Sequence, residues 1–291
     1  MTPAATLPPL LDAIEAGSLA ADRLDTISTG TLIARFATSC YADFGGQCGR
    51  GLLCLGGPDL PLGPLTVRTA GLPAGLAVGD TVSIGPSAPI VWQPPRPGNW
   101  SHSSMVSGLR AVRDIASGTA ADTGLTVLVF GMESPSMLPG FANRARSAID
   151  DLRLWLEAPD DRAEAPERGV RTLLGLGPGL TPSGDDFLVG MLVALSETGD
   201  DARQARLSEV VRRLAPIRTS PISTAHLLAA CDGMASDALH RALRTILCNA
   251  PALADDLNTL AAIGHSSGWD ALAGAIIILD YLRLWGSPHT C

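Results

Sequence analysis

The sequence contains no lysine, because all 21 of its cationic residues are arginine. A Schiff-base lysine, a pyridoxal phosphate site and a P-loop are therefore excluded, since each depends on a lysine amine. Any cation of this chain that holds a phosphate or carboxylate must be an arginine, which binds through a planar two-pronged guanidinium. A GC-rich genome would produce the same bias.

Several other signals are also missing. None of the six cysteines forms a C-x-x-C pair, and none lies near a histidine at zinc-site spacing. Residues 1–17 have no basic stretch and no apolar run, so we expect no signal peptide. The longest apolar run, residues 271–279, is too short to span a bilayer. We expect a cytoplasmic protein with reduced thiols and no membrane contact.

The charge balance excludes one further class of partner. The formal net charge is −8, and no arginine cluster offsets it, so nucleic acid is not expected as a partner. Hydrophobic residues make up 46% of the chain and charged residues 17%, which is enough apolar material for a substantial core. We therefore expect a folded protein of one large domain or two ordinary ones.

The pattern along the chain predicts an α+β protein. A β-rich domain, a small antiparallel sheet or barrel, is expected over residues 1–99, where Gly and Pro clusters separate short apolar runs. A mainly helical domain is expected over residues 100–291. The expected strands are 31–37, 51–55, 65–69, 81–84, 89–92 and a further one at 125–130. The expected helices are 103–117, 143–156, 184–198, 202–215, 221–232, 236–249, 253–262 and 268–285.

The most informative segment is the Gly-rich loop at residues 175–186, which runs straight into an apolar helix. Glycine amides can approach a ligand closely, and the start of a helix favours anions. Asp185 and Asp186 are the strongest catalytic candidates, either as ligands of a magnesium ion or as hydrogen-bond partners of an amide substrate. The alternative is that one caps the helix and the other is solvated. The predicted substrate-binding residues of this loop are Gly177, Gly179, Thr181, Ser183 and Gly184.

The motif S-G-x-D-x-L-x-G occurs twice, at residues 183–190 and 267–274. In each copy the serine is predicted to cap the helix, with the aspartate three residues later completing a capping box. In each copy the closing glycine lies one helical turn after the aspartate. We expect the two helices to pack closely, with both N-termini beside one pocket.

The second copy brings further candidates. His265 and Asp270 are predicted to act in catalysis, with His265 hydrogen-bonded to substrate, and Ser266 and Ser267 to bind substrate. A simple capped turn, with a structural histidine, is the alternative. Adjacent residues do not form a hydrolytic triad, and no G-x-S-x-G elbow is present.

Three weaker candidates lie elsewhere. Thr219 and Ser223 are predicted to line the pocket, although a buried serine more often bonds its own helix. His226 shares a helical face with Ser223, and we do not expect it to be catalytic. Arg50, in a Gly-rich segment that favours a hairpin, could reach an anionic ligand, while Cys48 lacks a visible base.

The loop G-L-G-P-G-L-T-P-S-G-D-D at residues 175–186 resembles a bacterial family now associated with the AllH-type subunit of oxamate carbamoyltransferase. Residues 219–223 and 263–270 support this resemblance. It implies a subunit of a multi-protein complex in purine (allantoin) breakdown. That complex interconverts oxalurate and phosphate with oxamate and carbamoyl phosphate. The S-x-R-T phosphate motif of other carbamoyltransferases is absent, since Pro216 stands where that motif has serine.

Three functions remain open from the sequence. The first is a carbamoyltransferase subunit that binds a small anionic amide or ureide and works with other subunits. The second is a stand-alone metal-dependent amidohydrolase, which the lack of histidine pairs weakens. The third is a non-catalytic metabolite-binding subunit. A homo-oligomer is compatible with each of them.

Overall fold

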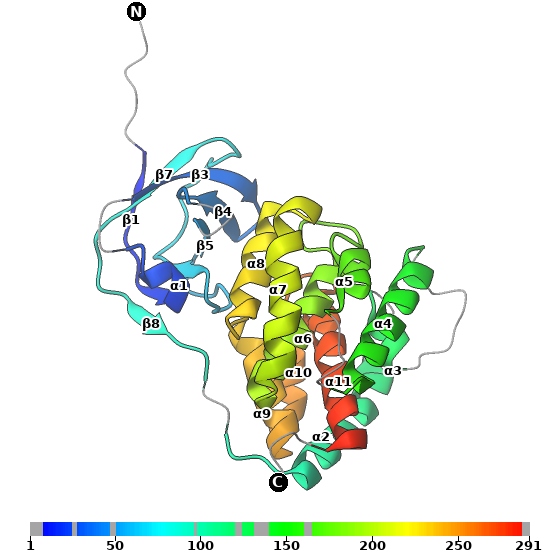
Figure 1. Cartoon of the computed structure of the whole chain (residues 1–291). Coiled ribbons are helices and arrows are strands. Elements are labelled where there is room, and N and C mark those ends of the chain that lie inside the picture. The colour runs from blue at the N-terminus through cyan, green and yellow to red at the C-terminus, as the bar shows by residue number, and fades with distance from the viewer. Residues whose placement is uncertain are drawn as a thin grey trace, which may run out of the picture. The chain divides into compact units, whose positions relative to one another are not determined.

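The computed structural model describes residues 8–24, 28–46, 51–95, 98–119, 124–130, 140–159 and 165–286. The chain divides into two compact units, Met1–Pro94 and Pro95–Cys291. Strands form the first unit and helices form nearly all of the second, so the predicted α+β class is confirmed (Figure 1). None of the helices in the described part of the chain is both long and apolar enough to cross a membrane.

The first unit is an eight-stranded mixed sheet with the order β1-β7-β3-β4-β5-β6-β2-β8. Its elements are β1 (Leu10–Leu11), β2 (Glu15–Gly17), the short helix α1 (Ser18–Ala21), β3 (Ser28–Arg35), β4 (Ser39–Asp43), β5 (Leu52–Gly56), β6 (Thr66–Arg68), β7 (Thr81–Ile84) and β8 (Ile90–Trp92). Its core lies on alternate positions of the strands, including Leu32, Leu53, Val67 and Val82.

The expectation of a purely antiparallel sheet is wrong. β1 pairs with β7, β2 with β8 and β5 with β6, all in parallel. Two of these pairings come from the first 17 residues, whose very short strands β1 and β2 join the sheet beside partners that are remote in the chain. The third joins β5 to β6, which follows it in the chain. β4 and β5 form an antiparallel pair on either side of the Gly-rich segment, as a hairpin requires. Cys48 and Arg50, in that segment, lie outside the described residues.

The second unit consists of helices around two central ones, α6 and α11 (Figure 1). The helices are α2 (His102–Thr119), α3 (Thr126–Phe130), α4 (Ala142–Glu157), α5 (Glu167–Leu173), α6 (Ser183–Thr198), α7 (Asp201–Arg218), α8 (Pro221–Cys231), α9 (Asp237–Cys248), α10 (Leu253–Ala261) and α11 (Ser267–Trp285). Every predicted helix is present within a few residues. α6 and α11 are buried on nearly all sides, which explains why their sequences are apolar throughout.

The predicted strand at residues 125–130 is wrong, because this segment forms the helix α3. Its apolar run cannot distinguish a buried helix from a buried strand. A helix satisfies its own backbone groups, and no strand is described in this unit that could pair with an extended segment. α3 packs against α11, with Thr126 and Val127 buried.

Candidate functional site

The two copies of the repeated motif lie where α6 and α11 cross. A Cβ on Gly190 would stand 1.7 Å from the carbonyl oxygen of Ala271, and a Cβ on Gly274 would stand 1.9 Å from that of Phe187. The closing glycine of each helix therefore lies directly against the backbone of the other helix. The contact is made at the residue that follows the motif aspartate. The helices pack closely, as the repeated motif predicts.

The approach to each helix is also built twice. In the first copy, Leu176 N–H donates to Leu173 O at 2.8 Å, and Gly184 N–H donates to Leu176 O at 2.9 Å. Gly184 is so close to α5 that a Cβ would stand 2.2 Å from Leu173 O. The residues that make the same contacts in the second copy are Leu260, Ile263 and Gly268. The two helix–loop–helix units are therefore structural equivalents that meet at their loops.

The predicted capping boxes are wrong. Ser183 and Ser267 are the first residues of α6 and α11, and neither helix has a side-chain cap. The serines instead act across the crossing: a hydrogen bond from Ser267 lowers the pKa of Asp186, and one from Ser183 lowers that of Asp270. The short distance between the two backbones favours this exchange over local capping.

The two loops also contact each other directly. Thr181 Oγ1 lies 3.1 Å from Ser267 Oγ. Both Gly177 and Gly179 have a positive φ, which turns the loop back onto the start of α6, and Gly179 has open space beside its Cα. The structure therefore brings together Thr181, Ser183, Asp186, Ser267 and Asp270.

Asp185 has a different environment from its neighbour Asp186. Its side chain is buried, with Oδ1 accepting from Gly175 N–H at 2.8 Å and Oδ2 accepting from the Thr219 hydroxyl. Burial raises the pKa of Asp185, against hydrogen bonds from Thr219, Gly175 and Ser223. Because both oxygens already accept hydrogen bonds, this geometry favours a role in positioning the loop over the predicted catalytic or magnesium-binding role.

The turn between α7 and α8 also holds the Gly-rich loop in place. Ser220 Oγ donates to Leu180 O at 2.6 Å and Ser223 Oγ at 3.4 Å, while Ser220 also caps α8 by accepting from Ser223 N–H. Thr219 holds Asp185. The sequence predicts Thr219 and Ser223 as pocket lining. In the structure they hold the loop through hydrogen bonds to Asp185 and to Leu180 O.

This arrangement makes a testable prediction about stability. Thr219→Val removes the hydroxyl that donates to the buried Asp185 carboxyl, so the free energy of unfolding should fall by about 1–2 kcal/mol in urea titrations. Thr259→Val is the matched control, because Thr259 is exposed on α10 and its hydroxyl donates to the carbonyl oxygen of Asp255 in its own helix. Equal changes in the two variants would contradict the supporting role of Thr219.

Asp270 is 0% exposed, and its two oxygens differ. Oδ1 accepts from Leu125 N–H at 2.5 Å, whereas Oδ2 is buried with no hydrogen-bond partner. The preceding Gly124 leaves room for the carboxyl, since a Cβ there would stand 2.2 Å from Oδ1. Burial raises the pKa of Asp270 to about 6, even though Leu125, Ser183 and Ser266 hydrogen bonds lower it.

Asp186 is half-buried, but its Oδ2 atom is enclosed and has no hydrogen-bond partner. Burial raises its pKa well above the usual value, and the nearby charges of Asp270 and Asp185 act in the same direction. Two carboxyls in such an arrangement do not readily ionise together. Each copy of the motif thus contributes one enclosed carboxyl oxygen that is free to bond a ligand.

The histidines are not part of this carboxyl pair. His265 is exposed on the loop before α11, and among the described contacts none joins it to Asp186 or Asp270. Desolvation lowers the pKa of His226 to about 4, so its ring is neutral at pH 7. Within the described residues, no three His, Cys, Asp or Glu side chains lie close enough to hold a metal ion.

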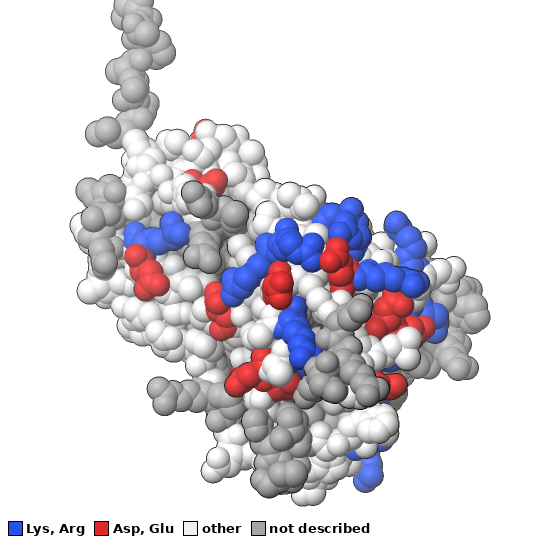
Figure 2. Space-filling view, viewed as in Figure 1, with Lys and Arg blue, Asp and Glu red and all other residues white. Residues whose placement is uncertain are grey.

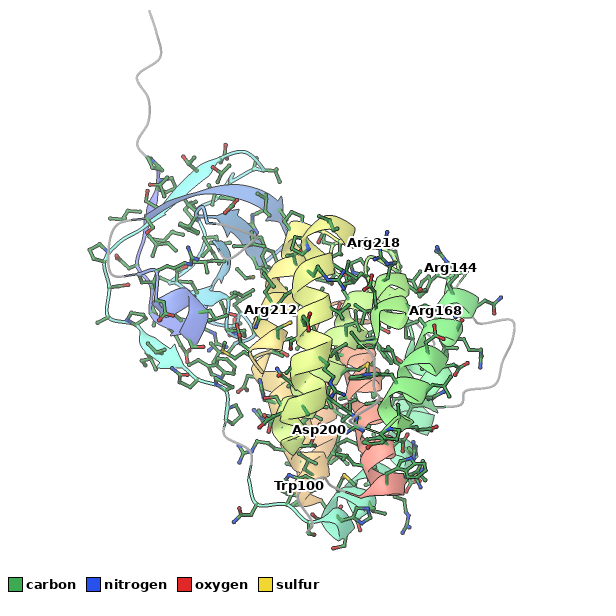
Figure 3. The ribbon with its side chains drawn as sticks, viewed as in Figure 1. Trp100, Arg144, Arg168, Asp200, Arg212 and Arg218 are labelled. Atoms are coloured by element: carbon green, nitrogen blue, oxygen red, sulfur yellow. The ribbon has the colours of Figure 1, made fainter. Side chains whose placement is uncertain are left out.

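The arginines nearest in sequence to the Gly-rich loop lie on the surface of α5 and α7 (Figures 2 and 3). Arg218 donates to Arg171 O at 3.0 Å, and Glu167 pairs with both Arg171, at 2.5 Å, and Arg213, at 2.7 Å. In the described part of the chain, none of these arginine contacts reaches Asp186 or Asp270. This site therefore consists of carboxyls, hydroxyls and helix N-termini.

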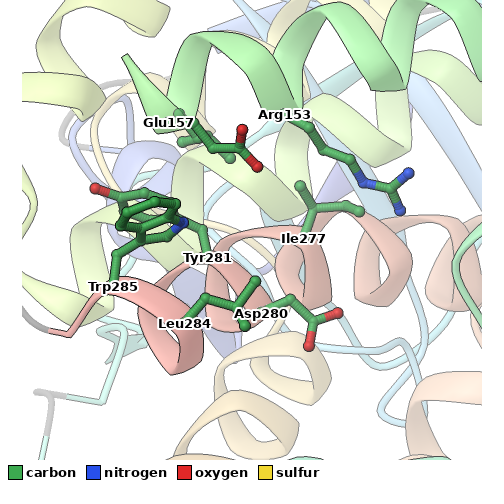
Figure 4. Close-up of a pocket in the computed structure, with 8 residues that line it drawn as sticks. Arg153, Glu157, Ile277, Asp280, Tyr281, Leu284 and Trp285 are labelled. Carbon is green, nitrogen blue, oxygen red and sulfur yellow. The ribbon is translucent and has the colours of Figure 1, made fainter. Parts of the chain in front are cut away.

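Two surface cavities lie elsewhere in the helical unit. A cavity of about 70 Å³ lies between α4 and α11, lined by Arg153 and Glu157 of α4 and by residues of α11 that include Tyr281 and Trp285 (Figure 4). A more open cavity of about 320 Å³ lies between α4 and the start of α5. Neither is lined by a residue of the two loops, so the predicted pocket does not correspond to either cavity.

Sequence reasoning missed Gly124 and Leu125, which hold the Asp270 carboxyl. The only sequence signal is a glycine before an apolar run, and that pattern occurs many times in this chain. The contact joins residues 145 positions apart, which no local pattern encodes.

Comparison with known proteins also points to the part of the helical unit that contains the two motif copies. Residues 173–279 match the model of the family described as oxamate carbamoyltransferase subunit AllH, which confirms the resemblance predicted from the loop. The matched residues run from the end of α5 into α11 and contain both copies of the motif. No solved structure matches the chain. The match relates this part of the helical unit to a carbamoyltransferase subunit.

Proposed function

We propose that this chain is a subunit of a carbamoyltransferase that acts on a small oxamate-type or ureide substrate with carbamoyl phosphate, in purine (allantoin) degradation. The observation that carries the proposal is the meeting of the two motif copies, both inside the matched region, with one unpaired carboxyl oxygen from each. The cost of leaving such atoms buried and unpaired is about 1–3 kcal/mol each, which a bound ligand would recover.

The N-termini of three helices can stabilise the negative charge at the anionic end of such a substrate. Leu180 contacts the N-terminus of α8 through Ser220 and Ser223, while Thr181 contacts that of α11 through Ser267. The same loop opens α6. Helix N-termini carry a partial positive charge, so the segment from Gly177 to Gly184 is suited to a carboxylate or phosphate.

The carboxyl pair would then face the neutral end of the substrate, the carbamoyl or amide group. Asp186 and Asp270 are the residues that we propose to contact it, with Ser183 and Ser267 orienting their carboxyls. Asp185, Thr219 and Ser223 act indirectly by holding the loop. Further cations for a phosphate group would come from the other subunits of the complex.

The proposal is tested by reconstitution. We expect carbamoyl transfer to oxamate only when the purified chain is mixed with the other subunits encoded beside it. Asp186→Asn should lower that activity at least tenfold, because Asn replaces an acceptor oxygen with a donor at the reacting group. Asp201→Asn, in the exposed first turn of α7, is the matched control. Full activity of the Asp186 variant in the mixture would favour a non-catalytic binding subunit.

The alternative of a metal-dependent amidohydrolase gains no support from the described residues. A metal ion at Asp185 would have to displace the hydrogen bonds from Gly175 and Thr219. Ureide hydrolysis by the purified chain alone, abolished by a chelator, would nevertheless establish it.

A further inference from the structure

We infer that Asp186 and Asp270 together bind a single NH₂ group of the substrate, with the Oδ2 atom of each aspartate accepting one of its two N–H bonds. This inference rests on the proposed function and deepens it. It assigns the carboxyl pair to a primary amide or carbamoyl NH₂ and assigns the helix N-termini to the anionic end.

The two unpartnered oxygens are equivalent in the structure. Asp186 and Asp270 hold the same place in two structurally equivalent units, and in each the Oδ2 atom is buried without a hydrogen-bond partner. Asp270 is 0% exposed, so bulk water cannot satisfy its free oxygen. Its other oxygen is already held by Leu125 N–H at 2.5 Å. What the site lacks is therefore a donor for each of two enclosed acceptors.

Few ligand groups can supply two hydrogen-bond donors from one atom. An amide NH₂ carries two N–H bonds on a single nitrogen and no charge. A carboxylate or phosphate presents only acceptors, which would face Asp186 and Asp270 without any hydrogen bond. The elements packed around the pair reinforce this exclusion, because α6 adds Asp185 as a third acidic group and the described residues of α3 add no ionisable side chain.

The two carboxyls lie near each other, because the charge of Asp270 raises the pKa of Asp186. Each has an enclosed Oδ2 atom with no hydrogen-bond partner. A hydrogen bond from the serine of the opposite copy lowers the pKa of each carboxyl, Ser267 for Asp186 and Ser183 for Asp270. One group that donates to both Oδ2 atoms would therefore join the two motif copies without competing for an oxygen that already accepts a hydrogen bond.

The test measures binding directly and does not need turnover. Isothermal titration calorimetry with the full-length chain, and with the reconstituted complex, would compare oxamate, N,N-dimethyloxamate and oxalate. We expect oxamate to bind at least tenfold more tightly than either of the others, because only oxamate carries both the anionic end and two N–H bonds. Equal affinities for oxamate and its dimethyl derivative, or no oxamate binding to either preparation, would overturn the inference.

Two variants sharpen this test. Asp186→Asn and Asp270→Asn each place an amide NH₂ where a carboxyl oxygen would accept from the ligand, and each leaves one acidic group fewer to face oxalate. Each should weaken oxamate binding at least tenfold while leaving oxalate binding unchanged or stronger. Asp201→Asn should change neither, and circular dichroism would verify that all three variants are folded. A parallel loss for both ligands would contradict the inference.

The outcomes separate this inference from the proposed function. If the complex has no transferase activity but the preference for oxamate and its reversal by the variants hold, the NH₂ site stands and the proposed reaction fails. If the complex transfers carbamoyl groups but binds the dimethyl derivative as tightly as oxamate, the reaction stands and the NH₂ site fails.

Discussion

Replacing Gly190 or Gly274 with alanine is expected to lower the free energy of unfolding by about 3 kcal/mol or more, or to prevent folding. An alanine Cβ would stand 1.7 Å from Ala271 O in the first case and 1.9 Å from Phe187 O in the second. Both neighbours are backbone atoms of a buried helix, so no side chain can move aside. The two central helices would have to separate, which costs more than typical overpacking by a methyl group.

The sign of this effect is diagnostic. Alanine in a helix interior is favoured over glycine by about 1 kcal/mol, so an uncrowded position would be stabilised by the same substitution. Gly140→Ala is the control for crowding, because Gly140 lies in an exposed turn before α4 and a Cβ there meets nothing within 4 Å. Thermal and urea unfolding of the three variants would decide the matter. A Gly190 or Gly274 variant as stable as the Gly140 variant would contradict the close crossing.

The close crossing of α6 and α11 also affects the geometry of the carboxyl pair. Asp186 and Asp270 lie one helical turn before Gly190 and Gly274, so the distance between the helix backbones also sets the distance between the two carboxyls. Ser183 and Ser267 can reach the opposite aspartate only at this short separation. The glycines therefore connect the packing of the core to the geometry of the candidate site.

Much of the helical unit could be predicted from the sequence. The Gly-rich loop, the start of α8 at Ser220-Pro221 and the repeated motif depend on local chemistry, and local chemistry is what a single sequence displays. The same holds for the close packing of α6 and α11, since a glycine at the same place in two apolar helices allows backbones to approach. The parallel pairings of the sheet depend on remote partners, and they were not predicted.

The roles of Asp185 and Asp186 show where sequence reasoning ends. Neighbouring residues on a helix point about 100° apart, so one of these carboxyls faces the turn before α8 and the other faces α11. Which of them finds Thr219 and which finds Ser267 depends on the tertiary fold. The capping boxes failed for a related reason, because Ser183 and Ser267 had better partners across the crossing than within their own helices.

The last prediction uses the pH dependence of stability. In the folded protein burial raises the pKa of Asp270 from 3.8 to about 6, so the fold favours the protonated acid. Between these two values the folded state binds more protons than the unfolded state, and stability therefore falls as the pH rises. A shift of this size corresponds to about 3 kcal/mol, which is available below pH 4 and lost above pH 6.

Asp270→Asn removes this dependence, because an asparagine side chain does not ionise and its carbonyl oxygen can still accept from Leu125 N–H. Relative to the parent protein, the variant should gain about 3 kcal/mol in free energy of unfolding between pH 4 and pH 8, measured by urea titration at each pH. Asp201→Asn, at an exposed helix start, should show a difference that changes little with pH. A constant difference for the Asp270 variant would mean that folding leaves the pKa of Asp270 at its unfolded value. In that case the fold itself would have to supply the second carboxyl oxygen with a donor, and no substrate NH₂ group would be needed to satisfy it.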